Sequence, residues 1–246
     1  MSKQLWAAVD DYTTDLLMPA DPALEAALAA SDAAGLPAIG VSPSQGKLLM
    51  LLAQLAGASR ILEIGTLGGY STIWLARALP SDGRLITLEA NPKHAEVARG
   101  NIVHAGLAGL VEVRLGDARR SLREIAAEGC GPFDLFFIDA DKKSIPEYFE
   151  WAIKLSHRGS LIIVDNVIRD GALIDAKSDD PNIQGVRRLH EVLATEPRVS
   201  ATTIQTVGSK GYDGFTLALV ELEGSIGEAK VCHICDCHGG SGFERK

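Results

Sequence analysis

Five short apolar runs recur along the middle of the chain, and they constrain the fold more than any other feature. The runs begin near residues 60, 84, 110, 133 and 160, so that successive starts lie 23 to 27 residues apart. This interval accommodates one strand, one helix and two loops. The apolar character of each run is continuous rather than alternating, which is typical of strands covered on both faces. The repeat therefore predicts a parallel, doubly wound sheet with right-handed crossovers.

The segments on either side of the repeat complete the predicted α/β fold. Residues 199–222 contain two further strand candidates, which gives a central, mostly parallel, seven-stranded sheet flanked by helices. The residues before the repeat read as three helices, at about 4–17, 22–34 and 43–56. With 46 % hydrophobic residues among 246, the chain is long enough to bury one substantial core.

We accordingly expect one folded domain with two flanking parts. An N-terminal helical segment, 1–57, precedes the core, 58–222, and a tail, 223–246, leaves the fold. The tail contains C-H-I-C-D-C-H, in which Cys232-x-x-Cys235 has the spacing of half a zinc knuckle. A closed site would need Cys237 or His238 in a cramped loop, or a second chain, so we interpret the tail as a disordered extension without function.

Local signals place two of the helix ends. Asn91 followed by Pro92 predicts an N-cap and a first helical turn, and Gly106 closes that helix. The pattern Ser144-x-x-Glu147 predicts a capping box, so that the next helix begins directly after residue 143.

Charge and hydropathy exclude several classes of partner. The formal net charge is −8, and the Lys and Arg residues are scattered, which disfavours nucleic acid as the main partner. The apolar runs are too short to cross a bilayer, and the first residues carry charges where a signal peptide needs apolar ones. We therefore expect a cytoplasmic protein with no membrane partner.

The loop after the first predicted strand has the composition of a cofactor site. It reads E-I-G-T-L-G-G-Y-S, in which Gly65 and Gly69 allow a tight turn and close approach of a ligand, and Ser71 opens a helix. Glu89 ends the second strand and is placed to accept hydrogen bonds from two ribose hydroxyls. The spacing G-x-x-G-G is not the dinucleotide fingerprint G-x-G-x-x-G. Glu63, two residues before the first glycine, also suits a cationic amino-acid cofactor better than a diphosphate. The alternative is a tight strand–helix turn and nothing more.

A set of motifs in this order and spacing resembles one enzyme family. E-I-G-T-L-G-G-Y-S, Glu89, G-D-A at 116–118, F-I-D-A-D-K at 137–142 and I-V-D-N at 163–166 are similar to the cation-dependent O-methyltransferases of the caffeoyl-CoA and catechol type. The likeness spans about residues 37–221. It implies a Rossmann-like methyltransferase fold, S-adenosylmethionine as methyl donor, a divalent cation (Mg²⁺, with Mn²⁺ or Ca²⁺ left open), a small aromatic vicinal diol as acceptor, and a homodimer with the N-terminal segment on the acceptor and dimer side.

The same resemblance implies roles for individual residues. Lys142 matches the general base, and the matched metal ligands are Asp139, Asp165 and Asn166. The matched cofactor-binding residues are Val41, Glu63, Gly65, Gly69, Ser71, Glu89, Asp117, Ala118 and Asp139. Two carboxylates and an amide supply only oxygen ligands, which suits a hard octahedral cation and argues against zinc.

Plainer interpretations exist for the same residues. Strand-end aspartates often cap the next helix, and Lys142 can be a surface lysine. Arg169 is either a solvated loop arginine or a receptor for an acidic group on the acceptor. Asp141 is expected at a helix terminus or as a support of the site residues, and His94 has no assigned role. Trp74 and Trp151, at helical spacing, are expected in the core. The alternatives for the whole chain are a nicotinamide-dependent oxidoreductase and a non-catalytic cofactor-binding protein.

Overall fold

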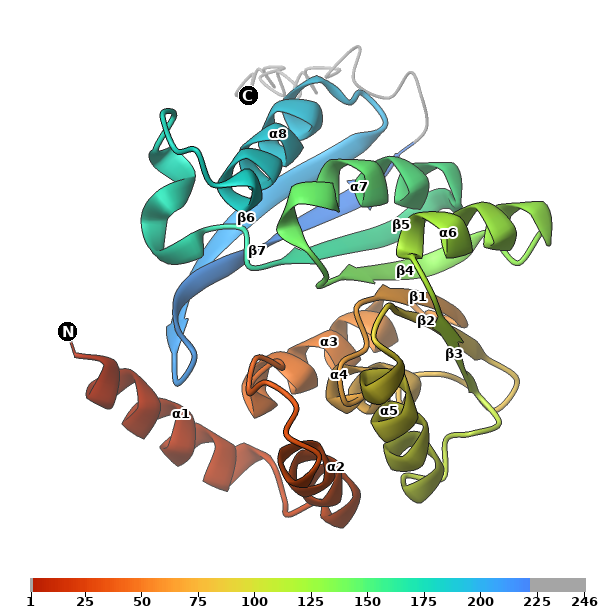
Figure 1. Cartoon of the computed structure of the whole chain (residues 1–246), viewed down its shortest axis with the longest axis vertical. Helices are drawn as coiled ribbons and strands as arrows, with labels where there is room; N and C mark the ends of the chain where they lie inside the picture. Colours follow the sequence, from red (N-terminus) through yellow and green to blue (C-terminus); the bar gives the residue numbers. More distant parts are fainter. Residues whose placement is uncertain (1, 222–246) are drawn as a thin grey trace, which may run out of the picture.

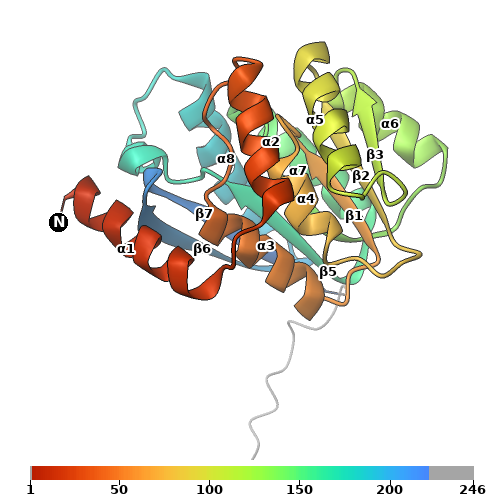
Figure 2. The ribbon, with the colours of Figure 1, turned by 90° about the horizontal axis from the view of Figure 1, so that it is seen from below.

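The computed structural model describes residues 2–221, which form a seven-stranded sheet covered by helices on both faces (Figures 1 and 2). The strand order is β3-β2-β1-β4-β5-β7-β6. The first five strands of this order run parallel, and β7 is antiparallel to both of its neighbours. The strands are β1 Arg60–Ile64, β2 Arg84–Glu89, β3 Val111–Leu115, β4 Phe133–Ile138, β5 Ser156–Asp165, β6 Val199–Gly208 and β7 Gly211–Val220. The predicted mostly parallel, seven-stranded α/β sheet is confirmed.

Two layers of helices enclose this sheet. Figure 1 shows α6, α7 and α8 on one face, with α3, α4 and α5 on the other and α2 packed outside them. The helices are α1 Lys3–Leu17, α2 Pro22–Ala33, α3 Pro43–Leu55, α4 Tyr70–Ala76, α5 Pro92–His104, α6 Ala118–Ala127, α7 Ile145–Lys154 and α8 Pro181–Thr195, with short 3₁₀ helices η1 Lys142–Ser144 and η2 Arg169–Ile174. The three predicted N-terminal helices therefore form where expected. No helix within residues 2–221 is long and apolar enough to span a membrane.

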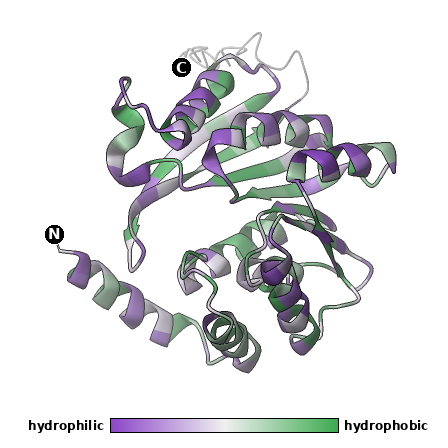
Figure 3. Ribbon diagram, in the orientation of Figure 1, coloured by the Kyte–Doolittle hydropathy of each residue, from purple (hydrophilic) through white to green (hydrophobic). Residues whose placement is uncertain are grey.

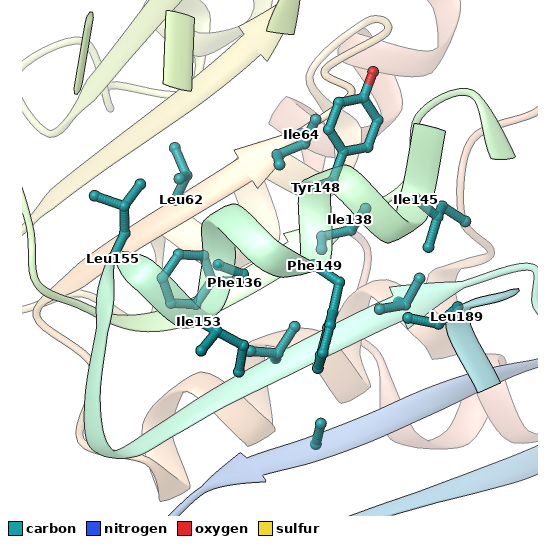
Figure 4. Close-up of a cluster of buried hydrophobic side chains, with 14 of the residues drawn as sticks. Leu62, Ile64, Phe136, Ile138, Ile145, Tyr148, Phe149, Ile153, Leu155 and Leu189 are labelled. Carbon is teal, nitrogen blue, oxygen red and sulfur yellow. The ribbon is translucent and has the colours of Figure 1, made fainter. Parts of the chain in front are cut away.

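The strand β4 shows why the apolar runs are continuous. Phe136 and Ile138 point into the core beneath α6, α7 and α8, where they meet Phe149 of α7 (Figure 4). Leu135 and Phe137 point into the second core, beneath α2, α3 and α4. All four strand side chains are buried because successive residues face opposite sides of a sheet that is covered twice. In Figure 3 the central strands are correspondingly hydrophobic along much of their length, whereas the helices alternate.

One helix begins with the predicted cap, and another begins where predicted but without its predicted hydrogen bonds. Asn91 caps α5 by accepting hydrogen bonds from the backbone N–H groups of residues 93 and 94, and Gly106 follows the helix with a φ of 73°. Ser144 is the N-cap residue of α7, as predicted, but the hydrogen bonds of the predicted capping box are absent. The Ser144 hydroxyl donates instead to Asp141 Oδ2 at 2.5 Å, and the backbone forms η1 before α7 begins at Ile145. The Asp141 carboxylate, one turn earlier, is the stronger acceptor for this hydroxyl.

The ends of the chain differ in how they relate to the core. The helix α1 has no buried residue, and it contacts the sheet through β6. The predicted tail from residue 223, with its Cys/His motif, lies outside the described residues.

Candidate active site

The carboxyl ends of the parallel strands open into a cavity of about 830 Å³. It lies where the strand order reverses between β1 and β4, the position at which α/β sheets of this kind bind ligands. Most of the predicted site residues line it: Val41, Gly65, Ser71, Glu89, Asp117, Ala118, Asp139, Lys142 and Asn166. The other three, Glu63, Gly69 and Asp165, do not line it. Glu63 is joined to it through Ser71, Gly69 adjoins Tyr70, and Asp165 precedes Asn166 but lines a separate small apolar pocket. Sequence positions more than a hundred residues apart are thereby brought together.

The glycine loop between β1 and α4 is shaped by its close approach to β4. Gly65 has a φ of 101°, and a Cβ atom there would collide with the carbonyl oxygen of Asp139. Gly69, with a φ of 81°, stands at the N-cap of α4. Leu67 between them also adopts a positive φ, of 50°, which is uncommon for a leucine. The positive φ angles of the loop therefore depend on its two glycines and on the close contact between Gly65 and Asp139.

The Glu89 carboxylate fixes the other side of this loop. Its Oε2 accepts a hydrogen bond from the Leu67 N–H at 2.8 Å, and its Oε1 accepts one from Asn91 N–H at 2.9 Å. Oε2 also accepts a hydrogen bond from the Thr66 N–H at 3.3 Å, so both of its lone pairs are used, whereas Oε1 retains one. His94 Nδ1 lies 3.6 Å from Glu89 Oε1, and this histidine also lines the cavity. The sequence analysis gave His94 no role, although its position in the first turn after the acidic strand end was a usable signal.

Glu63 reaches the cavity only through its partners. The side chain is fully buried, with Oε1 accepting a hydrogen bond from Ser71 Oγ at 2.6 Å and Oε2 accepting one from Thr72 Oγ1 at 2.5 Å. Burial raises the pKa of the Glu63 carboxyl to about 7, and the two hydroxyl groups oppose that rise. Glu63 thus anchors the first turn of α4 beneath the cavity.

Asp117 and Ala118 form the far end of the cavity. Asp117 caps α6 by accepting hydrogen bonds from the backbone of Arg119 and Arg120. The Arg119 guanidinium forms an ion pair with the same carboxylate at 2.8 Å and, as the main cause, lowers the pKa of Asp117 to about 2. Arg119 also lines the cavity, and the sequence analysis did not single it out.

Two aspartates meet where β4 and β5 end. Ile138 and Val164 are paired in the sheet, so Asp139 and Asp165, the next residues, emerge side by side. Lys142 Nζ donates to Asp139 Oδ1 at 2.6 Å, and this lysine is only 8 % exposed. It is therefore not a surface lysine. Burial, followed by the charge of Asp139, raises the pKa of Asp165 well above its ordinary range, and Lys142 opposes this effect.

Asn166 completes the oxygen cluster. Its backbone has a φ of 56°, its N–H donates to Asp165 Oδ1 at 2.8 Å, and its side chain lines the cavity. Within residues 2–221 no three His, Cys, Asp or Glu side chains form a metal-binding group, so a metal site here depends on the Asn166 amide as third ligand. Two adjacent carboxylates that repel one another, with an amide oxygen beside them, fit a hard divalent cation.

Other side chains support this cluster. The Tyr148 hydroxyl, which lines the cavity, donates to Asp141 Oδ1 at 2.6 Å, and burial raises the pKa of Tyr148. The Asp141 carboxylate therefore fixes the position of the Tyr148 side chain and of the start of α7 through two hydrogen bonds. Trp74 is buried, and Trp151 packs against the core, as expected.

Comparison with known proteins agrees with this geometry. The sequence matches the O-methyltransferase family over residues 22–220. It is 55 % identical to a catechol O-methyltransferase of Niastella koreensis over 90 % of this chain and 100 % of that protein. A catechol O-methyltransferase of Mycobacterium tuberculosis is 56 % identical, over 86 % and 94 % of the two chains.

Solved structures of O-methyltransferases also resemble this chain over most of its length. An O-methyltransferase from Bacillus cereus in complex with SAH has a TM-score of 0.89 and 59 % identity, covering 89 % of this chain and 100 % of that one. The O-methyltransferase TomG from Streptomyces achromogenes, in complex with SAM, has a TM-score of 0.88 and 53 % identity, covering 90 % and 100 %. The chain belongs to the O-methyltransferase family and is an enzyme of that class. The predicted resemblance is confirmed, and an oxidoreductase is not favoured.

Proposed function

We propose that this enzyme transfers a methyl group from S-adenosylmethionine to one hydroxyl of a catechol-like small molecule, with the help of a divalent cation. The observation that carries the proposal is the cluster at the ends of β4 and β5. There the buried Lys142, the Asp139 carboxylate and Asn166 line the same cavity as the glycine loop, and Asp165 lies beside Asp139 at the paired strand end. Acceptor activation and methyl-donor binding therefore share one site.

The cofactor side of the cavity is formed by the first three parallel strands. Glu89, with a free lone pair on Oε1, would accept hydrogen bonds from the ribose hydroxyls, and Asp117 and Ala118 would contact the adenine. Val41 and the glycine loop, supported by Glu63 through Ser71, would hold the methionine part. The relatives from Bacillus cereus and Streptomyces achromogenes, which hold SAH and SAM, support this assignment.

The cation side is formed by Asp139, Asp165 and Asn166. Their oxygen-only ligand set favours Mg²⁺, with Mn²⁺ or Ca²⁺ as possible replacements. When bound, such a cation would act as a Lewis acid on an acceptor hydroxyl and orient a vicinal diol. The names of the two curated relatives support a catechol as that acceptor.

Lys142 is proposed as the general base. Its Nζ already lies against Asp139, so it stands beside the position that an acceptor oxygen would occupy. Lys142, as the neutral amine, would take the hydroxyl proton and become an ammonium while the oxygen forms its bond to the methyl carbon. The sulfur–methyl bond breaks at the same time, and S-adenosylhomocysteine leaves.

A homodimer is part of the proposal. Apolar side chains exposed on α1 and α3 support it, since an isolated chain would leave them in water: Leu5, Val9, Leu16, Leu17, Leu51 and Leu55. Light scattering at micromolar concentration tests the oligomeric state directly.

The substrate class is tested by three acceptors offered with S-adenosylmethionine and Mg²⁺: catechol, 1,3-dihydroxybenzene and phenol. Only catechol presents two adjacent oxygens, so it should be methylated, and the other two should react at least a hundredfold more slowly. Equal rates on all three would contradict a site built for vicinal diols.

A further inference from the structure

Three cations line the acceptor side of the cavity without a carboxylate partner. We define the acceptor side as the part formed by the residues after β4 and β5, the segment 36–40 and the turn between β6 and β7. Lys143, Arg169 and Lys210 line it. None of the ion pairs found between described residues involves any of the three.

Arg169 is held in place by its backbone, and part of its side chain has no protein partner. Its N–H donates to Asp213 Oδ1 at 3.0 Å, and its φ of 55° lies in the left-handed region. The Nε atom is buried and has no hydrogen-bond partner among the residues that the structure describes. A buried donor without an acceptor is unfavourable, and strained backbone near a cavity is a common mark of a functional residue. The described part of the chain therefore leaves the Arg169 guanidinium incompletely hydrogen-bonded.

Lys210 approaches the cavity from the β6–β7 turn, which extends beyond the sheet toward α1 (Figure 1). Its Nζ donates to the carbonyl oxygen of Ala38 at 3.0 Å and retains two further protons. The turn itself is anchored, because Ser209 N–H donates to Asp10 Oδ2 at 2.7 Å. Lys210 is therefore a fixed cation at the rim.

The carboxylates on this side are already engaged. Asp141 accepts the hydroxyls of Ser144 and Tyr148, and Asp213 accepts backbone N–H groups. Asp139 and Asp165 form the proposed cation site. The remaining carboxylates that line the cavity, Asp32, Glu89 and Asp117, belong to α2 and to the ends of β2 and β3. Within residues 2–221, Lys143, Arg169 and Lys210 thus form no ion pair with these carboxylates.

We propose that the acceptor is a catechol that carries a carboxylate, and that Arg169 and Lys210 bind this group. The inference rests on the proposed function and names the substrate class of the same site. A guanidinium presents two parallel N–H donors that match the two oxygens of a carboxylate, and the lysine adds a point charge at the rim. The diol oxygens face the Asp139 cluster while the carboxylate faces Arg169.

The test compares two acceptors that differ in one charged group, 3,4-dihydroxybenzoate and 3,4-dihydroxybenzamide, in the full-length enzyme with Mg²⁺ and S-adenosylmethionine. The wild type should show a higher kcat/KM for the benzoate. Arg169→Gln should lower kcat/KM for the benzoate about 10- to 100-fold and for the benzamide less than threefold. Lys210→Met should act in the same direction by about 3- to 10-fold, and Arg169→Lys should restore part of the loss.

A matched control is Lys154→Met, which removes a cation that lies 4.8 Å from the Trp151 ring on α7. Lys154→Met should change neither the kcat/KM for the benzoate nor the kcat/KM for the benzamide. Equal losses on both acceptors in Arg169→Gln, or a wild type that prefers the benzamide, would overturn the inference. Turnover of catechol itself separates this inference from the proposed function. If catechol is methylated but Arg169→Gln leaves the kcat/KM for the benzoate relative to the benzamide unchanged, only the carboxylate site is refuted. If no diol is methylated, both are refuted.

Discussion

Replacing Glu63 by glutamine should make the stability of the fold less dependent on pH. Glu63 is fully buried, and burial raises its pKa from 4.5 to about 7. A group whose pKa is higher in the folded than in the unfolded state stabilises the fold fully below the unfolded pKa. That contribution is lost as the pH rises through the folded value. The ionised carboxylate of Glu63 therefore opposes folding above pH 7.

The magnitude follows from the two pKa values. At about 1.4 kcal/mol per pKa unit, the wild type should lose about 2–3 kcal/mol of unfolding free energy between pH 5 and pH 8 through Glu63 alone. Glutamine is neutral at both pH values and keeps the shape of the protonated acid. The glutamine NH₂ group cannot accept a hydrogen bond from Ser71 or Thr72, which costs unfolding free energy. This cost is the same at pH 5 and pH 8, so it cancels when the two unfolding free energies are subtracted.

The assay is urea unfolding of wild type and Glu63→Gln at pH 5 and pH 8, with chelator and without cofactor. The variant should gain about 2–3 kcal/mol relative to wild type on going from pH 5 to pH 8. Glu150→Gln, on an exposed position of α7, is the control and should show no such gain. Parallel pH dependence in wild type and Glu63→Gln would refute the reasoning, since Glu63 would then ionise alike in the folded and unfolded states.

Three further perturbations test other contacts. Lys142→Met should lower kcat on catechol about 10²- to 10⁴-fold, with little change in cofactor affinity by calorimetry. The loss in kcat should be smaller with a nitro-substituted catechol, which ionises unaided. An undiminished kcat on catechol at pH 7 would show that Lys142 is not the base. Asn101→Ala removes a buried amide that donates to the Gly68 carbonyl at 2.8 Å, so it should cost about 1–3 kcal/mol in urea unfolding and also weaken cofactor binding; an unchanged midpoint would exclude Asn101 as a support of the glycine loop. The hydrogen bond from Asp134 raises the pKa of His157, so the stability that His157 adds over His157→Gln should be greatest below about pH 6 and should vanish as the pH rises through the raised value; a constant difference from pH 5 to 9 would contradict this.

The sheet could be predicted because its signal is local. The run F-D-L-F-F-I is apolar on both sides, and strand β4 covers it residue for residue. The sequence predicts that β5 starts at residue 160, but the strand starts four residues earlier, at Ser156. Its first residues, S-H-R-G, are mostly exposed, and they join the sheet through backbone pairing with Phe133, which apolar content cannot reveal.

The site was predictable to the extent that its residues follow strand ends. Asp139, Glu89 and Asn166 line the cavity because parallel strands deliver their last residues to one edge. Lys210 was not found, because its place depends on how far the β6–β7 hairpin extends past the sheet, a tertiary property. The burial of Glu63 was likewise invisible, since the sequence does not show that its carboxylate points under α4 rather than into the loop.

We propose that Asp139, Asp165 and Asn166 hold a cation on which methyl transfer depends. The most direct measurement is methyl transfer to catechol by chelator-treated enzyme during titration with Mg²⁺, for wild type and Asp165→Ala. The wild type should be inactive without Mg²⁺ and should regain turnover along a saturable curve, whereas Asp165→Ala, folded by circular dichroism, should stay at least a hundredfold less active at any Mg²⁺ concentration. Full wild-type turnover in excess chelator, or an Asp165→Ala curve that coincides with the wild type, would contradict the account.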